Sequence, residues 1–245
     1  MRNNIMKIKH RVLINFFSFC CVFLLLAEAV YGNDIKVKVF DKELKEKNEY
    51  MDINLNIPQV NIDSNISFKD KINKSIYDDI KNWKRDLEYL AKNDKEDFQK
   101  SNAPWIPFIL NTTYNEAYNN KNILSLVIDY YQYTGGAHGL TTRISYNFYL
   151  NEEKKLMLKD IFKDNYDYKD FIDNFIKKEI EKSPKEYFNN GKKFTGVKEN
   201  TDFYISEKEL VVYFQLYEIA PYSSGIREFK IPYKLLKDNL KYELK

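Results

Sequence analysis

The sequence predicts an α+β protein, in which an antiparallel β-sheet packs against a long amphipathic helix and a second, shorter helix. Several segments alternate apolar and polar residues, as half-buried strands do. Two others repeat apolar residues every three or four positions, as amphipathic helices do. Their order along the chain is strands, helix, strands, helix, strands, with no series of parallel βαβ units. This order favours helices packed on an antiparallel sheet.

The composition is that of a folded domain. The chain has 245 residues, enough for one or two domains. Its 20 Tyr, 17 Phe and 2 Trp exclude a disordered chain, because such chains are poor in aromatic side chains. Two Cys and two His exclude a disulfide-stapled scaffold and a zinc cluster made only of Cys and His.

The first 32 residues have the layout of a signal peptide. Four basic residues open the segment, an apolar run extends from Val12 to Ala27, and Ala27-Glu28-Ala29 is a small-x-small cleavage pattern. We therefore predict a signal peptide over residues 1–29, with cleavage after residue 32 as a second possibility. The alternative is an uncleaved helix that anchors the chain in a membrane. A run of about 16 residues is short for a span, which needs ~20, and this favours cleavage.

Cleavage changes the composition of the working domain. Cys20, Cys21 and His10 leave with the segment, so that His138 becomes the one histidine of the mature chain. Removing four basic and one acidic residue from the totals of 39 and 36 leaves 35 of each. We therefore expect no thiol chemistry, no disulfide, no bound metal and no other cofactor. The balanced charge also removes the main support for nucleic-acid binding.

Residues 33–120 are predicted to form a strand–helix subdomain. Segments 35–40 and 51–57 alternate and suggest an antiparallel hairpin, which Pro58 ends. A helix is expected from Ser67, which opens a capping-box-like sequence, to about Asn93. Its apolar stripe consists of Ile72, Ile76, Ile80, Trp83, Leu87 and Leu90.

Residues 121–245 are predicted to form an α+β subdomain that makes one compact unit with the first. A β-rich region begins at 106–119, and strands are expected at 123–133, 143–150, 203–205, 210–219 and 226–231. The strand 123–133 is expected to be central, because it is apolar on both faces near its start. A helix is expected over 167–182, ended by Pro184, and a short one over 233–240, after Pro232.

Two glycine-containing loops are the most unusual local sequences: 133–139, which reads Tyr-Thr-Gly-Gly-Ala-His-Gly, and 220–225, which reads Ala-Pro-Tyr-Ser-Ser-Gly. Paired glycines allow exposed backbone amides that can hold an anion or a carbonyl group. His138 has no second His or Cys near it, so we favour a packing or capping role over a catalytic base. The serines of the second loop lack the Gly-x-Ser-x-Gly pattern of a nucleophile elbow. The candidate ligand-binding residues are Tyr133, Gly135, Gly136, His138, Gly139, Pro221, Tyr222 and Ser223.

No catalytic residue stands out from the sequence. Asp160, Asp164 and Asp167 are carboxylates of the kind that a glycan hydrolase uses as acid and base. Nothing selects a pair among them, and solvated acids near helix starts are the favoured interpretation. Most of the tyrosines suit half-buried sheet faces. Tyr222, in a proline-containing loop, is the one we assign to recognition, because tyrosine offers a large stiff surface with a polar tip.

The two loops, together with Leu158-Lys159-Asp160-Ile161-Phe162 and Ile231-Pro232-Tyr233, resemble a family of exported bacterial domains. This family forms the extracellular half of lysozyme-sensing anti-sigma factors of the RsiV type. It also forms the accessory region of PdaC-type peptidoglycan deacetylases. A strand that ends in proline before a long helix, as 51–58 and 67–93 are expected to do, is part of the same resemblance.

The resemblance implies an exported, non-catalytic domain that binds or senses a ligand in the envelope of a Gram-positive-type bacterium. The implied ligand is a lysozyme-like wall hydrolase or peptidoglycan. Deacetylase chemistry is not carried over, since it belongs to a separate metal domain that needs an Asp and two His. The anti-sigma role is not carried over either, because few residues precede the apolar run. The alternative from another class is a carboxylate-dependent hydrolase of cell-wall glycan.

Overall fold

The computed structural model describes residues 34–63, 65–101 and 104–244. Residues Ile35–Lys245 form one compact unit. The predicted signal peptide over 1–29, and the second cleavage point after residue 32, lie outside the described residues. The α+β class is confirmed, with a six-stranded sheet, a three-stranded sheet, and helices of which one is long.

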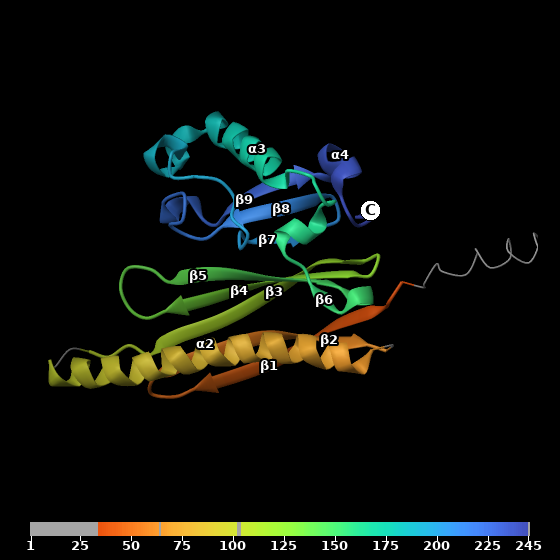
Figure 1. The fold of residues 1–245 in the computed structure, drawn as a ribbon. Coiled ribbons are helices and arrows are strands. Elements are labelled where there is room, and N and C mark those ends of the chain that lie inside the picture. The colour runs from red at the N-terminus through yellow and green to blue at the C-terminus, as the bar shows by residue number, and fades with distance from the viewer. Residues whose placement is uncertain (1–33, 64, 102–103, 245) are drawn as a thin grey trace, which may run out of the picture. The chain divides into compact units, whose positions relative to one another are not determined.

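The larger sheet has its strands in sequence order (Figure 1). They are β1 (Val37–Lys47), β2 (Met51–Ile62), β3 (Phe108–Asn120), β4 (Ile123–Tyr133), β5 (Leu140–Tyr149) and the two-residue β6 (Lys154–Lys155). Four of the five pairings are antiparallel, and β2 and β3 are parallel.

The parallel pair corrects the expectation of a purely antiparallel sheet. Helix α2 (Ile66–Lys100) connects β2 to β3 and is therefore the crossover of a βαβ unit. The strand β2 spans about 40 Å and the 35-residue helix about 50 Å. Because the helix returns the chain over the full length of β2, Phe108 starts β3 beside Met51, at the beginning of β2.

The first hairpin is confirmed but is longer than predicted. The expected turn over 41–49 is mostly strand, since β1 continues to Lys47 as the edge strand of the sheet. Pro58 was expected to end the second strand, and that expectation is wrong. Strand β3 pairs only with Met51–Leu55, so one edge of β2 carries no ladder at Pro58, and proline is tolerated at such an edge.

Helix α2 begins one residue earlier and ends later than predicted. Asn65 caps it, because its side chain accepts a hydrogen bond from the backbone N–H of Phe68. Trp83 is half-buried and packs edge-on against Tyr130. Leu90 is 42% exposed, contrary to the predicted stripe, and Ala91 takes the next buried position. The buried face consists of Phe68, Ile72, Ile76, Ile80, Leu87 and Ala91.

The C-terminal part contains a second sheet that the sequence did not separate from the first. It consists of β7 (Phe203–Ile205), β8 (Glu209–Phe214) and β9 (Arg227–Pro232), all antiparallel. Helix α3 (Tyr168–Lys182) is capped by the Asp167 side chain and buries Ile172, Ile176 and Ile180. Helix α4 (Tyr233–Leu236) is shorter than predicted, because a 3₁₀ turn replaces its second half.

Two hydrophobic clusters make up the core. One joins α2 to β2, β3, β4 and β5 and extends to Leu150. The other joins α3, α4 and the three-stranded sheet to Tyr118 and Ile123. Strand β4 is central, as predicted, with β3 and β5 on either side. The division into 33–120 and 121–245 stays a prediction.

No helix within the described residues combines the length and the apolar character that a membrane crossing needs.

Candidate functional site

The two loops that the sequence singled out meet in the structure. The imidazole ring of His138 stacks on the ring of Tyr222, with centroids 3.9 Å apart and planes 17° from parallel. The Tyr222 hydroxyl donates a hydrogen bond of 2.9 Å to the carbonyl oxygen of Gly139, 83 positions away. The β4–β5 loop and the 220–225 loop therefore form one surface.

Tyr217 adds a third ring to this surface. Its ring centroid lies 5.7 Å from that of Tyr222, and its hydroxyl lies 3.4 Å from Nε2 of His138. We call His138, Tyr217 and Tyr222 the ring cluster. The sequence predicts Tyr217 inside the strand 210–219, whereas β8 ends at Phe214 and the Tyr217 side chain is 49% exposed beyond it.

The backbone of Tyr217 is strained. Its φ is +65°, a left-handed conformation that bulky residues seldom adopt. A tight turn holds it there, since Glu218 N–H donates to the Gln215 carbonyl and Gln215 N–H donates to the Glu218 carboxylate at 2.8 Å. Strain of this kind persists where the surroundings fix it and gathers at functional sites. The strain singles out the ring cluster as a candidate site.

The other predicted residues lie around the ring cluster. Gly135 and Gly136 form the exposed tip of the first loop with φ of +99° and +90°. The hydroxyl of Tyr133 donates to the Gly136 carbonyl and closes that tip. Gly139 is buried, and a Cβ there would lie 2.4 Å from the Tyr131 hydroxyl oxygen. In the second loop, the Pro221 carbonyl accepts from Ser224 N–H, and Ser223 is exposed.

A groove of about 510 Å³ adjoins the ring cluster through Tyr217. We call it the lysine groove, because Lys192, Lys193 and Lys198 line it together with the carboxylate of Glu218. All three lysines are exposed, and none forms an ion pair with a described residue. The residues that line the groove therefore carry more positive than negative charge, with three lysines against one carboxylate. The lysine groove is not evident from the sequence, because residues 192–198 have the composition of a polar loop.

A larger groove, of about 710 Å³ between α3 and β9, has a different charge arrangement. Most of its cations are paired with its own carboxylates: Lys182 with Glu179, Arg227 with Glu186, and Lys230 with Glu228. Paired charges offer little attraction to an added ion. The lysine groove is thus the better candidate for an anionic group.

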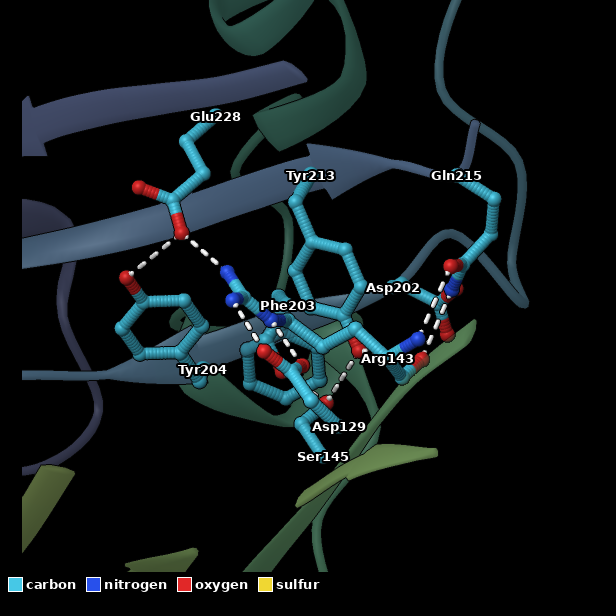
Figure 2. Close-up of polar contacts among 9 residues, drawn as sticks. All are labelled: Asp129, Arg143, Ser145, Asp202, Phe203, Tyr204, Tyr213, Gln215 and Glu228. Atoms are coloured by element: carbon cyan, nitrogen blue, oxygen red, sulfur yellow. Dashed lines mark hydrogen bonds and ion pairs between the residues drawn. The ribbon is translucent and has the colours of Figure 1, made fainter. Parts of the chain in front are cut away.

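A half-buried ion network joins strands of the two sheets (Figure 2). The guanidinium of Arg143 donates two bonds to Asp129, of 2.7 and 2.8 Å, and a third to Glu228, which also accepts from Tyr204. The hydrogen bond to Asp129 raises the pKa of Arg143 above its ordinary value, and burial opposes it. Burial and Glu228 raise the pKa of Tyr204 to about 12. A signal existed in the sequence, since Asp129 and Arg143 fall on neighbouring strands and pair directly.

Gln215 connects this network to the ring cluster. Its side-chain amide accepts from the backbone N–H of Arg143 and donates to the Arg143 carbonyl at 2.7 Å, as a neighbouring strand would (Figure 2). The same amide donates to the carboxylate of Asp202. Gln215 also starts the turn that holds Tyr217, so the position of the exposed ring depends on the junction between the sheets.

Asp202 makes this junction sensitive to pH. Burial raises the pKa of Asp202 above its ordinary value of 3.8, the Gln215 hydrogen bond lowers it, and Glu218 raises it further. An acid with a raised folded-state pKa holds its proton more tightly in the folded state, so the stability of the fold falls as the pH rises from 3.8 through the raised pKa.

We expect the substitution Asp202→Asn, which keeps a hydrogen-bond acceptor for Gln215, to remove this loss of stability. In urea unfolding from about pH 3 to 7, the free energy of unfolding of the variant should rise relative to that of the wild type as the pH increases. A difference between the two free energies that stays constant over this range would contradict the prediction.

The carboxylates considered for hydrolysis have structural roles. Asp160 accepts hydrogen bonds from Met157 N–H and the Lys154 ammonium, and Asp167 caps α3. Asp164 is exposed. Within the part of the chain that the structure describes, no group of three or more His, Cys, Asp or Glu side chains is arranged to hold a metal ion.

Comparison with family models places two matches in tandem along the chain. Residues 44–141 match the model described as deacetylase PdaC. Residues 159–234 match the model described as a protein of unknown function, DUF3298. The first match includes the loop 133–139 and the second includes the loop 220–225, while residues 142–158 lie between the two matches. They confirm the resemblance found in the sequence.

One curated relative is the peptidoglycan-N-acetylmuramic acid deacetylase PdaC of Bacillus subtilis (strain 168). It is 31% identical over 136 residues, which is 54% of this chain and 29% of the relative, so the chain spans less than a third of that protein's length. Two crystal structures share the fold. A DUF3298 family member from Bacteroides fragilis superposes with a TM-score of 0.63 at 22% identity. One from Pseudomonas aeruginosa superposes with 0.57 at 17%, and each match covers 85% of this chain and 95% of the other.

Proposed function

We propose that this chain, in which a PdaC-like region is followed by a DUF3298 region, is an exported, non-catalytic binding domain of the bacterial cell envelope whose ligand is peptidoglycan. The observation that carries the proposal is the ring cluster. Two loops far apart in sequence and the turn at 215–218 bring three rings together, and the Tyr217 ring is carried by a strained backbone that keeps it exposed.

The chemistry of the ring cluster suits a glycan. Tyrosine and histidine rings present flat faces to sugar rings, and their polar tips bond to hydroxyl and acetamido groups. The relative's name supports peptidoglycan as the glycan, since that protein is described as acting on it. The same relationship and the predicted signal peptide support an envelope location.

A lysozyme-like hydrolase is the other ligand that the resemblance implies. Lysozymes of this kind are strongly basic, so a partner surface should be acidic. The groove beside the ring cluster is lined by three lysines and one carboxylate, Glu218. This charge favours peptidoglycan over lysozyme at this face.

Hydrolysis of the glycan is the second candidate activity, and the ring cluster gives it little support. Glycan hydrolysis uses two carboxyl groups on either side of the scissile bond. The lysine groove contains the single carboxylate of Glu218 among its lining residues, and that group accepts a hydrogen bond from Gln215 N–H. Binding without turnover is the better match.

The test is co-sedimentation of the mature domain, residues 33–245, with purified peptidoglycan sacculi. We expect Tyr222→Ala to bind about tenfold more weakly, since truncating a central aromatic costs on the order of 1–2 kcal/mol. Tyr222→Phe should retain most of the affinity, because it keeps the stack on His138 and loses one hydrogen bond.

Tyr89→Ala is the matched control, because Tyr89 is 71% exposed on α2. Equal losses in Tyr89→Ala and Tyr222→Ala would remove the ring cluster from the proposal. Capture of lysozyme but not of sacculi would overturn the choice of ligand. Release of soluble sugar from the sacculi would replace binding by hydrolysis.

A further inference from the structure

The charge of the lysine groove allows the ligand to be specified further. Lys192, Lys193 and Lys198 surround a hollow of about 510 Å³ whose one carboxylate, Glu218, is already a hydrogen-bond acceptor within its own turn. The mature domain is neutral by count, so this local excess is not a by-product of a basic protein. Unpaired cations in a concave site point to an anionic ligand group.

The backbone of the groove fixes where these lysines stand. Asn189, Asn190 and Gly191 form three successive left-handed residues, with φ of +52°, +53° and +88°, directly before Lys192. The buried rings of Phe194 and Phe214 pack edge to face beneath the groove, and Thr201 Oγ1 accepts from the N–H of Lys198. The lysines therefore extend from a folded loop that is anchored at both ends.

Tyr217 belongs to both surfaces, because it lines the groove and contacts His138 and Tyr222. A ligand seated on the rings would place its next group in the groove. Resting on the proposed function, we propose that the lysine groove binds the carboxylate groups of the peptide stems that peptidoglycan carries, while the ring cluster holds the sugar. The domain thus distinguishes peptide-bearing glycan from a neutral glycan with the same acetylated sugars.

The experiment measures binding of two soluble probes to residues 33–245 by calorimetry. One probe is the disaccharide-peptide fragment released from peptidoglycan by a muramidase, and the other is a chitin tetramer, which has N-acetylated sugars and no carboxylate. We expect the wild type to prefer the first probe, and more salt to narrow that preference. The triple variant Lys192→Gln, Lys193→Gln, Lys198→Gln should bind the fragment about tenfold more weakly and the tetramer as the wild type does.

The matched control changes three other exposed lysines that form no ion pair with a described residue: Lys36→Gln, Lys38→Gln and Lys81→Gln. It should bind both probes as the wild type does. Unchanged fragment binding in the groove variant, or equal losses in both triple variants, would overturn the inference and leave the proposed function standing. If the wild type binds neither probe, the proposed function fails and the inference fails with it.

Discussion

Replacing Arg143 by Met should destabilise the fold by about 3 kcal/mol, the lower end of the cost of removing one partner from a buried ion pair, because this network is only partly buried. The side chains of Arg143, Asp129 and Glu228 are 20, 29 and 23% exposed, so the variant would leave two half-buried carboxylates close together. The exposed Lys230, whose ammonium lies 3.6 Å from Glu228, would be the nearest remaining cation of the network. For a chain of this length, the melting temperature should fall by roughly 6–12 °C. Thermal unfolding followed by circular dichroism measures this.

Lys182→Met provides the control for Arg143→Met. Lys182 also pairs with a carboxylate, that of Glu179, but its side chain is 68% exposed, and such surface pairs contribute about 0–1 kcal/mol. Arg143→Lys should fall between the two, because lysine keeps the charge and loses the two-pronged bond to Asp129. If Arg143→Met and Lys182→Met cost the same, the network does not hold the two sheets together.

Replacing Gly191 by Ala should lower the free energy of unfolding by roughly 3 kcal/mol, as much as replacing Arg143 by Met, for two separate reasons. The φ of +88° adds about 1–2 kcal/mol for any residue with a Cβ. The added Cβ would also lie 2.4 Å from Cγ2 of Ile180, a side chain buried in α3, and overpacking of a core adds about 1–3 kcal/mol. Urea unfolding of the wild type and the variant measures the sum.

Gly136→Ala separates these two contributions. Gly136 has nearly the same φ, +90°, but a Cβ there would meet nothing within 4 Å. It should therefore show the backbone cost alone, about 1–2 kcal/mol. A loss for Gly191→Ala that is no larger than for Gly136→Ala would mean that α3 moves aside without cost. Because Gly191 directly precedes Lys192, the larger loss should be accompanied by weaker binding of carboxylate-bearing fragments.

Local elements were predictable wherever one periodicity dominated. The alternation of Ile144, Tyr146 and Phe148 correctly gave one face of β5, and the spacing of Ile72, Ile76 and Ile80 gave the buried face of α2. Both patterns follow directly from the direction of successive side chains along a strand or a helix. The ends of elements were less predictable, since Asn65 rather than Ser67 caps α2 and the charged segment 41–47 is an edge strand.

The candidate site was predictable in part. The composition of the two loops indicated the correct segments, because glycine and proline mark backbone conformations that other residues avoid. Tyr217 was not distinguishable from the sheet tyrosines, because its exposure depends on a left-handed backbone that the Gln215–Glu218 turn imposes. Lys192, Lys193 and Lys198 fall in a polar segment that the sequence predicts as a loop, and only the fold brings them around one groove.

The sequence by itself determined the α+β class, the central place of β4 and the two unusual loops, because each of these depends on residues close together in the chain. Only the tertiary structure decided that β2 and β3 are parallel, that Arg143 joins two sheets, and that the loops meet at His138 and Tyr222. The physical reason is that such contacts join residues up to 85 positions apart. They depend on strand register and on the path of the crossover helix, which no local pattern of side chains encodes.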